Sequence, residues 1–119
     1  MALQSYRDLE VWKRGIDLVE SIYKLTSRFP SDEKFGLTSQ IRRASISVSS
    51  NIAEGYGRKH RGEYLRHLSF AAGSLAEVET QLIIAVRLQF ITEEEVHVTW
   101  DISQEVARML SKLITSLQE

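Results

Sequence analysis

Apolar residues recur at intervals of three and four along most of the chain, which is the spacing of one face of an α-helix. The pattern predicts helices at approximately residues 8–28, 34–56, 62–90 and 93–118. Nothing resembles a pair of strands or a hairpin turn. Helices of this length joined by short turns pack most simply as a bundle. We therefore predict an all-α fold, an antiparallel up-down-up-down four-helix bundle that forms a single domain over residues 1–119.

The first predicted helix carries two apolar stripes side by side. We expect Asp8 to be its N-cap and Pro30 to end it, because proline restricts the residue before it and has no N–H to donate. The first stripe contains Leu9, Trp12, Ile16, Val19 and Tyr23, and the second contains Val11, Leu18, Ile22, Leu25 and Phe29. Together they form an arc wider than one seam needs. This favours contact with another subunit, and the alternative is that the arc wraps a large core.

The second predicted helix has an apolar stripe next to a small and polar one. Its apolar members are Ile41, Ser45, Val48 and Ile52, and its small or polar members are Gln40, Ala44, Ser47, Asn51 and Glu54. Such a helix contacts neighbours on more than one side. We expect it to end near residues 55–57, where a glycine can adopt the left-handed conformation.

The last two predicted helices follow the same spacing. The main stripe of the third contains Leu65, Leu68, Ala72, Leu75, Leu82 and Val86, with Glu79 interrupting it. The fourth begins with a capping box formed by Thr92 and Glu95. Its inward residues are predicted to be Val96, Val106, Leu110, Leu113 and Leu117, with Trp100, Ala107 and Ile114 alongside.

Composition excludes several classes of protein. Hydrophobic residues make up 43% of the chain and charged residues 26%, as in ordinary globular proteins. The chain has no cysteine, which excludes a disulfide framework and a thiolate metal site and agrees with a cytoplasmic location. The first residues lack the apolar run of a signal peptide. The longest apolar run, residues 82–86, is too short to cross a bilayer, so we expect no membrane partner.

The middle of the chain is basic although the net charge is −1. Between Arg42 and His67 there are six Lys or Arg residues and two acids. Guanidinium groups suit phosphate oxygens, so this segment is a candidate for binding nucleic acid. The candidate binding residues are Arg42, Arg43, Arg58, Lys59, Arg61 and Arg66. The alternative is a solvated turn in which Glu63 pairs with His67 one helical turn later.

The sequence offers little for catalysis. A di-iron bundle needs two Glu-x-x-His motifs and two further glutamates. Here the spacing occurs once, from Glu94 to His97, in the first turn of the last predicted helix. Neither a His-Glu-x-x-His motif, nor a Gly-rich phosphate loop, nor a Ser-His-Asp arrangement can be assembled. We predict a protein that is not an enzyme, with no catalytic residue, no metal, no cofactor and no small-molecule substrate.

Several short motifs together resemble one known family. They are Asp8-Leu9-x-Val11-Trp12, Phe29-Pro30, Phe35-Gly36-Leu37-x-x-Gln40-x-Arg42-Arg43-Ala44, Asn51-Ile52-Ala53-Glu54-Gly55 and Gly73-Ser74-Leu75-x-Glu77-x-Glu79-Thr80-Gln81-Leu82. In this order they resemble the four-helix-bundle family of 23S rRNA intervening-sequence proteins over nearly the whole chain. The family usually has proline about two residues before the Asn. Here that position is Ser49, which predicts a straighter second helix.

The resemblance implies a ring-like homopentamer. Relatives of the family resemble the accessory variability determinant of diversity-generating retroelements, a pentameric basic bundle that binds nucleic acid and a reverse transcriptase. By resemblance, the expected partners are further copies of this chain and RNA or DNA. The alternative function is a protein–protein interaction scaffold without a nucleic-acid role.

Five polar residues match the family motifs and have two interpretations. They are Gln40, Asn51, Glu54, Glu77 and Gln81. They form either a site or, as we favour, a structural or interface network that pairs with Arg42 or Arg43 and fixes which helix faces which. The small residues Ala44, Ser47, Gly73 and Ser74 let helices approach closely, within one bundle or between subunits.

Overall fold

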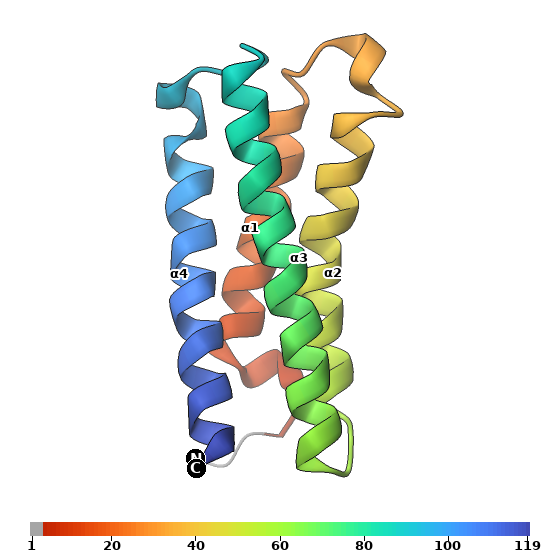
Figure 1. Cartoon of the computed structure of the whole chain (residues 1–119), viewed down its shortest axis with the longest axis vertical. Helices are drawn as coiled ribbons and strands as arrows, with labels where there is room; N and C mark the ends of the chain where they lie inside the picture. The colour runs from red at the N-terminus through yellow and green to blue at the C-terminus, as the bar shows by residue number, and fades with distance from the viewer. Residues whose placement is uncertain (1–3) are drawn as a thin grey trace.

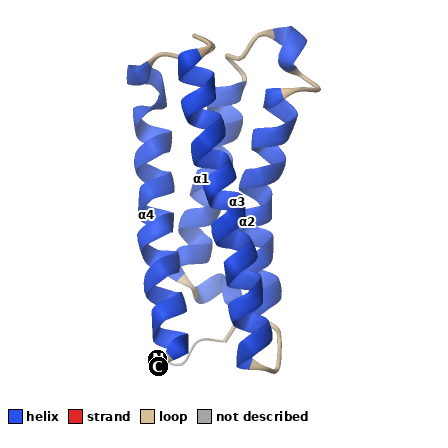
Figure 2. Ribbon diagram, in the orientation of Figure 1, coloured by secondary structure: helices blue, strands red, loops and turns tan. Residues whose placement is uncertain are grey.

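A computed structural model describes residues 4–119 and is almost entirely helical (Figure 1). Residues 4–119 contain no strand (Figure 2). The prediction of an all-α four-helix bundle is confirmed. The elements are η1 (Tyr6–Asp8), α1 (Glu10–Thr26), η2 (Ser31–Glu33), α2 (Leu37–Tyr56), α3 (Arg61–Arg87) and α4 (Glu93–Gln118).

Each long helix packs against two others. α1 contacts α2 and α4, and α3 contacts the same two helices from the other side. The chain turns back at each connection, so consecutive helices lie side by side (Figure 1). In an elongated body of 43 × 24 × 22 Å, the α1–α2 side therefore lies opposite the α3–α4 side.

The core is formed by the stripes that the spacing predicts on α1 and α2. Leu18 and Ile22 of the second α1 stripe are completely buried, as are Ile41, Val48 and Ile52 of α2. Burying a side chain of this size contributes about 1.5–3 kcal/mol. The first α1 stripe is only partly covered, because Leu9, Trp12, Ile16 and Val19 are half-buried.

On α3 and α4 the buried face is rotated from the predicted one. Leu65, Ala72 and Val86 of α3 are half-buried, and the core positions are Leu68, Ala71, Leu75, Val78, Leu82 and Ala85. On α4, Val106 and Leu110 are buried as predicted, but Val96, Leu113 and Leu117 are only half-buried, and Thr99 and Ser103 are buried as well. The two hydroxyls have partners: Thr99 bonds with Ser21 at 2.6 Å, and Ser103 donates to the Trp100 carbonyl at 2.6 Å. Satisfied hydroxyls can enter a core at little cost.

The start of α1 differs from the prediction, and Asp8 is not its N-cap. Ser5 caps the short turn η1, and Asp8 is the third residue of that turn. The Asp8 carboxylate accepts from the backbone N–H of Gln4 at 2.9 Å and of Ser5 at 3.3 Å. α1 then begins at Glu10, after Leu9, which makes no side-chain cap. Asp8 thus belongs to a capping box one element earlier than expected.

The left-handed residue that follows a helix is not a glycine and does not lie after α2. The prediction of a left-handed glycine after α2 is wrong, because Gly57 has φ −78° and no described glycine has a positive φ. The left-handed residue is Gln89, with φ 63°. Its N–H donates to the Val86 carbonyl, and that of Phe90 donates to the Ala85 carbonyl, both at 2.9 Å. These two hydrogen bonds form a Schellman motif. The motif ends α3 at Arg87, before the predicted residue 90.

Replacing Gln89 by glycine should raise the free energy of unfolding by about 1 kcal/mol. A side chain in the left-handed region costs about 1–2 kcal/mol, and glycine removes this cost. Part of the gain is lost because glycine gives the unfolded chain more conformational entropy. Urea denaturation measures the change. Gln89→Val, which is β-branched, should lower stability instead, and a glycine variant no more stable than wild type would contradict the assignment.

The predicted capping box at the start of α4 is confirmed. Thr92 Oγ1 accepts from the Glu95 N–H at 3.0 Å, and Glu95 Oε1 accepts from the Thr92 N–H at 2.9 Å. Glu95 also accepts from Arg28 of the α1–α2 connection. The hydrogen bond from the Thr92 backbone lowers the pKa of Glu95 most, and the hydrogen bond from Arg28 lowers it further. The bond from Arg14 of α1, at 2.7 Å, similarly lowers the pKa of Glu105.

These two carboxylates predict a loss of stability in acid. A carboxylate whose folded pKa lies below its unfolded value of about 4.3 stabilises the fold above that pH. The contribution disappears as pH falls through the lower, folded pKa. The melting temperature should therefore fall below about pH 4.3, and Glu95→Gln with Glu105→Gln should flatten that fall. Glu94→Gln, with no partner among the described residues, is the control and should leave the pH profile unchanged.

α3 is long and apolar enough to cross a membrane by length and composition alone. Core helices of bundles share this property, and α3 packs between α2 and α4. Its polar residues also have partners on those helices, Gln81 near Gln40 of α2 and Glu79 with Gln104 of α4. The absence of a membrane partner stays a prediction.

α2 is continuous through Ser49, the position where the family usually has proline. Ser49 faces Gly15 of α1 so closely that a Cβ on Gly15 would lie 2.8 Å from Ser49 Oγ. The hydroxyl is buried without a hydrogen-bond partner among the described residues. Small residues at both positions allow α1 and α2 to approach here.

Candidate nucleic-acid and subunit interfaces

Gly55 brings the end of α2 against the start of α3. A Cβ on Gly55 would lie 2.8 Å from His67 Cβ and 3.2 Å from the Tyr64 carbonyl oxygen. Tyr64 stacks edge-on against Tyr56 with ring centroids 6.1 Å apart. The burial of the Tyr64 phenol raises its pKa, and the neighbouring Tyr56 raises it further. The close approach fixes where the first turns of α3 present their side chains.

Backbone hydrogen bonds hold both ends of the connection between the two helices. The Arg58 N–H donates to the Gly55 carbonyl at 3.0 Å, and the N–H groups of Glu63 and Tyr64 donate to the His60 carbonyl at 3.1 Å. The His60 side chain makes no capping hydrogen bond at the start of α3. The four side chains of this basic turn are all exposed: Arg58, Lys59, His60 and Arg61.

A hollow of about 300 Å³ lies beside the basic turn. Its lining is Arg58, Glu63, Arg66, His67 and Phe70. The Arg66 guanidinium carbon lies 5.4 Å from the Phe70 ring centroid, within cation–π range. The His67 ring meets Phe70 edge-on at 5.8 Å. We call these five residues the basic hollow.

The cations at this site lack acidic partners. Among the described residues, Arg14, Arg28 and Lys13 form ion pairs, whereas Arg58, Lys59, Arg61 and Arg66 form none. The alternative pairing of Glu63 with His67 is not observed. His67 Nδ1 instead lies 3.2 Å from Asn51 Oδ1 and 3.6 Å from Glu54 Oε2. The positive charge of the turn therefore remains available to a ligand.

Two of the six candidate nucleic-acid residues lie away from the turn. Arg42 Nε donates to Thr26 Oγ1 at 2.9 Å, and its guanidinium lies over the Tyr23 ring at 4.4 Å. Arg42 thus ties α2 to α1. Arg43 is exposed and lines a second hollow, between α2 and α3, about 20 Å along the helix from Arg58. Only Arg58, Lys59, Arg61 and Arg66 are brought together.

The five family-matching polar residues all lie along the contact between α2 and α3. Asn51 Nδ2 donates to the Ser47 carbonyl at 2.9 Å. Asn51 and Glu54 of α2 both contact His67 of α3. Farther along, Gln81 Nε2 donates to Glu77 Oε2 at 3.1 Å and lies 3.5 Å from Gln40 Oε1. The groups that meet are amides, two carboxylates, a serine and a histidine. The expected pairing with Arg42 or Arg43 is not observed among the described residues.

The small residues of the same contact divide into two groups. Ser74 Oγ of α3 donates to Ser47 Oγ of α2 at 2.9 Å, and Ala44 is buried beside them. Gly73 is exposed, and a Cβ there would meet nothing within 4 Å. Its small size is therefore not required by packing within the chain.

Phe70 is the site residue that the sequence pattern missed. It is 46% exposed and lies outside the apolar stripe of α3. The available signal was its position, four residues after Arg66 and three after His67, which places the ring among basic side chains on one helix face.

No metal site is apparent in residues 4–119, where no group of three or more His, Asp or Glu side chains could hold an ion. The half motif Glu94 to His97 lies on α4, and His97 Nε2 is 3.4 Å from Asp101.

An apolar surface covers part of the α1–α2 side. It contains the half-buried Ile16 and Val19 together with Tyr23, which is 41% exposed, and Ile46, which is 42% exposed. Ile46 lies one helical turn after Arg42, whose guanidinium covers the Tyr23 ring. We call these four residues the α1–α2 apolar surface.

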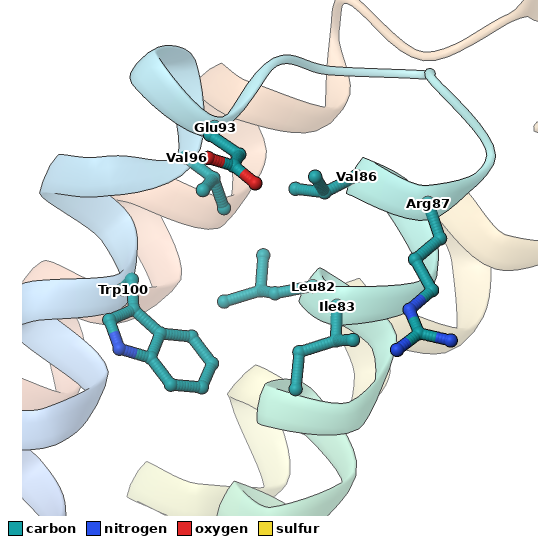
Figure 3. A pocket seen from close by; sticks show the side chains of 7 residues that line it. All are labelled: Leu82, Ile83, Val86, Arg87, Glu93, Val96 and Trp100. Carbon is teal, nitrogen blue, oxygen red and sulfur yellow. The ribbon is translucent and has the colours of Figure 1, made fainter.

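A second apolar surface lies on the α3–α4 side (Figure 3). Figure 3 shows the Trp100 ring of α4 directed toward Leu82 and Ile83 of α3. A hollow of about 280 Å³ lies between the helices, and Ile83 is 48% exposed. We call it the α3–α4 apolar groove, lined by Leu82, Ile83, Val86, Val96 and Trp100, with Arg87 and Glu93 at its edge.

Comparison with known proteins identifies the family of this chain. The family model described as 23S rRNA-intervening sequence protein matches residues 7–112. The chain belongs to this family. No curated protein matches the chain.

A solved structure shares the fold of this family member. It is the crystal structure of a protein of unknown function from the S23 ribosomal protein family of Bacteroides thetaiotaomicron. The two chains are 24% identical and superpose with a TM-score of 0.78, over 87% of this chain and 97% of the other. At this identity the likeness concerns the fold.

Proposed function

We propose that this protein is a non-enzymatic, cytoplasmic homo-oligomer that binds RNA or DNA through its α2–α3 turn. The observation that carries the proposal is the cluster of four cations without acidic partners, Arg58, Lys59, Arg61 and Arg66, beside a hollow with an exposed aromatic ring. Unpaired guanidinium and ammonium groups favour phosphate oxygens. Because the rest of the chain is acidic, the turn would orient toward a polyanion.

The two apolar surfaces support self-association. They lie on opposite sides of the bundle and differ in their residues, so the surface of one subunit can pack into the groove of the next. Repeated head-to-tail contacts of this kind form a ring where the rotation from one subunit to the next closes, and an open filament where it does not. The resemblance implies five subunits. If the ring axis runs along the helices, the basic turns of all subunits gather at one end of the ring, where their fields add.

The binding function predicts a steep dependence on salt. If three or four cations of the turn each neutralise one phosphate, log affinity for structured RNA should fall with log salt at a slope of about −2 to −4. The triple variant Arg58→Ala/Lys59→Ala/Arg61→Ala should bind at least about tenfold more weakly at 0.1 M salt, with a slope no steeper than about −1, because only Arg66 of the four cations remains. A salt-titrated gel shift measures both quantities.

A charge-matched variant separates this site from the overall charge. Lys24→Ala/Lys34→Ala/Lys112→Ala removes three exposed cations located elsewhere. It should keep both affinity and slope. If instead the turn variant retains RNA as wild type does, the turn is only surface, and the interaction-scaffold alternative holds.

A further inference from the structure

We infer that the basic hollow selects single-stranded over double-stranded nucleic acid, by stacking one base on Phe70 while Arg58 and Arg66 hold neighbouring phosphates. The inference rests on the proposed function and names its substrate class. It requires an accessible ring, cations placed beside it, and a geometry that a duplex cannot satisfy.

The Phe70 ring is accessible and held in place. The side chain is 46% exposed, although α3 buries its apolar stripe on the other side. Arg66 lies over the ring at 5.4 Å, and His67 contacts it edge-on at 5.8 Å. His67 is itself fixed near Asn51 and Glu54 of α2. An aromatic ring oriented in this way can stack a base without first being ordered, which favours binding.

The charges around the ring are arranged for one nucleotide. Arg58 reaches the hollow from the turn, and Arg66 lies one helical turn before Phe70. Both can bind phosphates, and Arg66 can also stack on a base. Glu63 repels phosphate from its part of the hollow, where its carboxylate can accept from a base amino group. At about 300 Å³, the hollow matches the lower end of small-ligand sites.

A duplex cannot use this arrangement. Its bases stack on one another, and side chains cannot reach into the deep major groove of A-form RNA. Only the phosphates of a duplex would contact the turn, and phosphate contacts alone do not distinguish strands. Unstacked bases of single strands are available to aromatic rings, and this stacking tolerates any base.

The test compares one RNA in two forms. Fluorescence anisotropy is measured with a labelled 12-nucleotide oligo(A) RNA, alone and annealed to oligo(U). Wild type should bind the single strand about tenfold or more tightly than the duplex. Phe70→Leu should weaken single-strand binding about five- to hundredfold and leave duplex binding unchanged. Phe35→Leu is the matched control, because Phe35 is 89% exposed beside Lys34 at the other end of α2, and it should change neither affinity.

The outcomes separate this inference from the proposed function. Equal binding of both forms, unchanged by Phe70→Leu, overturns the inference and leaves nucleic-acid binding intact. Binding of neither form overturns both. If light scattering shows that Phe70→Leu alters subunit number, base stacking at this position is tested with Phe70→Trp instead. Quenching of the new indole by the single strand and not by the duplex supports stacking, whereas retained binding without quenching overturns it.

Discussion

Replacing Gly55 by alanine should lower the free energy of unfolding by about 2 kcal/mol, although alanine normally stabilises a helix interior by about 1 kcal/mol over glycine. The new Cβ would lie 2.8 Å from His67 Cβ, closer than packed carbon atoms approach, and 3.2 Å from the Tyr64 carbonyl oxygen. Neither neighbour can rotate away, because one is backbone and the other is attached directly to it. α3 must shift, and overpacking of this kind typically costs about 1–3 kcal/mol, occasionally more.

Gly73→Ala and Gly62→Ala are matched controls on α3. Neither new Cβ would meet an atom within 4 Å. Gly73→Ala should gain about 0.5–1 kcal/mol from helix propensity, and Gly62→Ala should be near neutral in the first turn. Urea denaturation of all three variants at one protein concentration gives the comparison. A Gly55→Ala variant as stable as wild type would contradict the close approach of α2 and α3.

The same substitution connects packing to function. His67 and Phe70 are positioned by the crossing at Gly55, so a shift of α3 should also reshape the basic hollow. We expect Gly55→Ala to weaken single-strand binding more than duplex binding, because phosphate contacts tolerate displacement better than stacking does.

The core of α1 and α2 could be predicted from sequence because each buried stripe follows one helical face without interruption. On α4, the buried Thr99 was missed because its hydroxyl finds Ser21 of α1, a partner 78 residues away. The end of α3 was misplaced for a related reason. Gln89 adopts a conformation that favours glycine, and its neighbours provide the hydrogen bonds that hold it there.

Charge spacing likewise predicted only part of the site. Arg42 and Arg43 are adjacent in sequence, but they lie about 100° apart around α2. That rotation sends Arg42 to Thr26 and Tyr23 of α1 and leaves Arg43 exposed. Which helix receives each side chain is decided by tertiary packing, and a count of basic residues cannot show it. Phe70 was missed because an apolar residue off the stripe has meaning only beside its spatial neighbours.

The other large effect is expected from placing a charge on either apolar surface. Ile46→Glu on the α1–α2 apolar surface and Ile83→Glu at the α3–α4 apolar groove should each convert the assembly to the 13.6 kDa monomer. Both positions are partly exposed, so the bundle itself should stay folded. Desolvating a carboxylate in an apolar contact costs several kcal/mol, more than an arginine one helical turn away returns, and this weakens association at least about a hundredfold. Val98→Glu, on an exposed site between α1 and α4, is the control and should keep the wild-type mass.

Mixing the two monomeric variants should restore one contact and no more. The Ile46→Glu variant keeps an intact α3–α4 apolar groove, and the Ile83→Glu variant keeps an intact α1–α2 apolar surface. In a head-to-tail assembly these two faces fit each other, so an equimolar mixture should scatter light as a species of twice the monomer mass. Further growth is blocked, because the remaining faces of the pair both carry the charge. A variant that dimerises alone would show that each face binds its own copy, and a mixture that stays monomeric would show that the two surfaces do not meet.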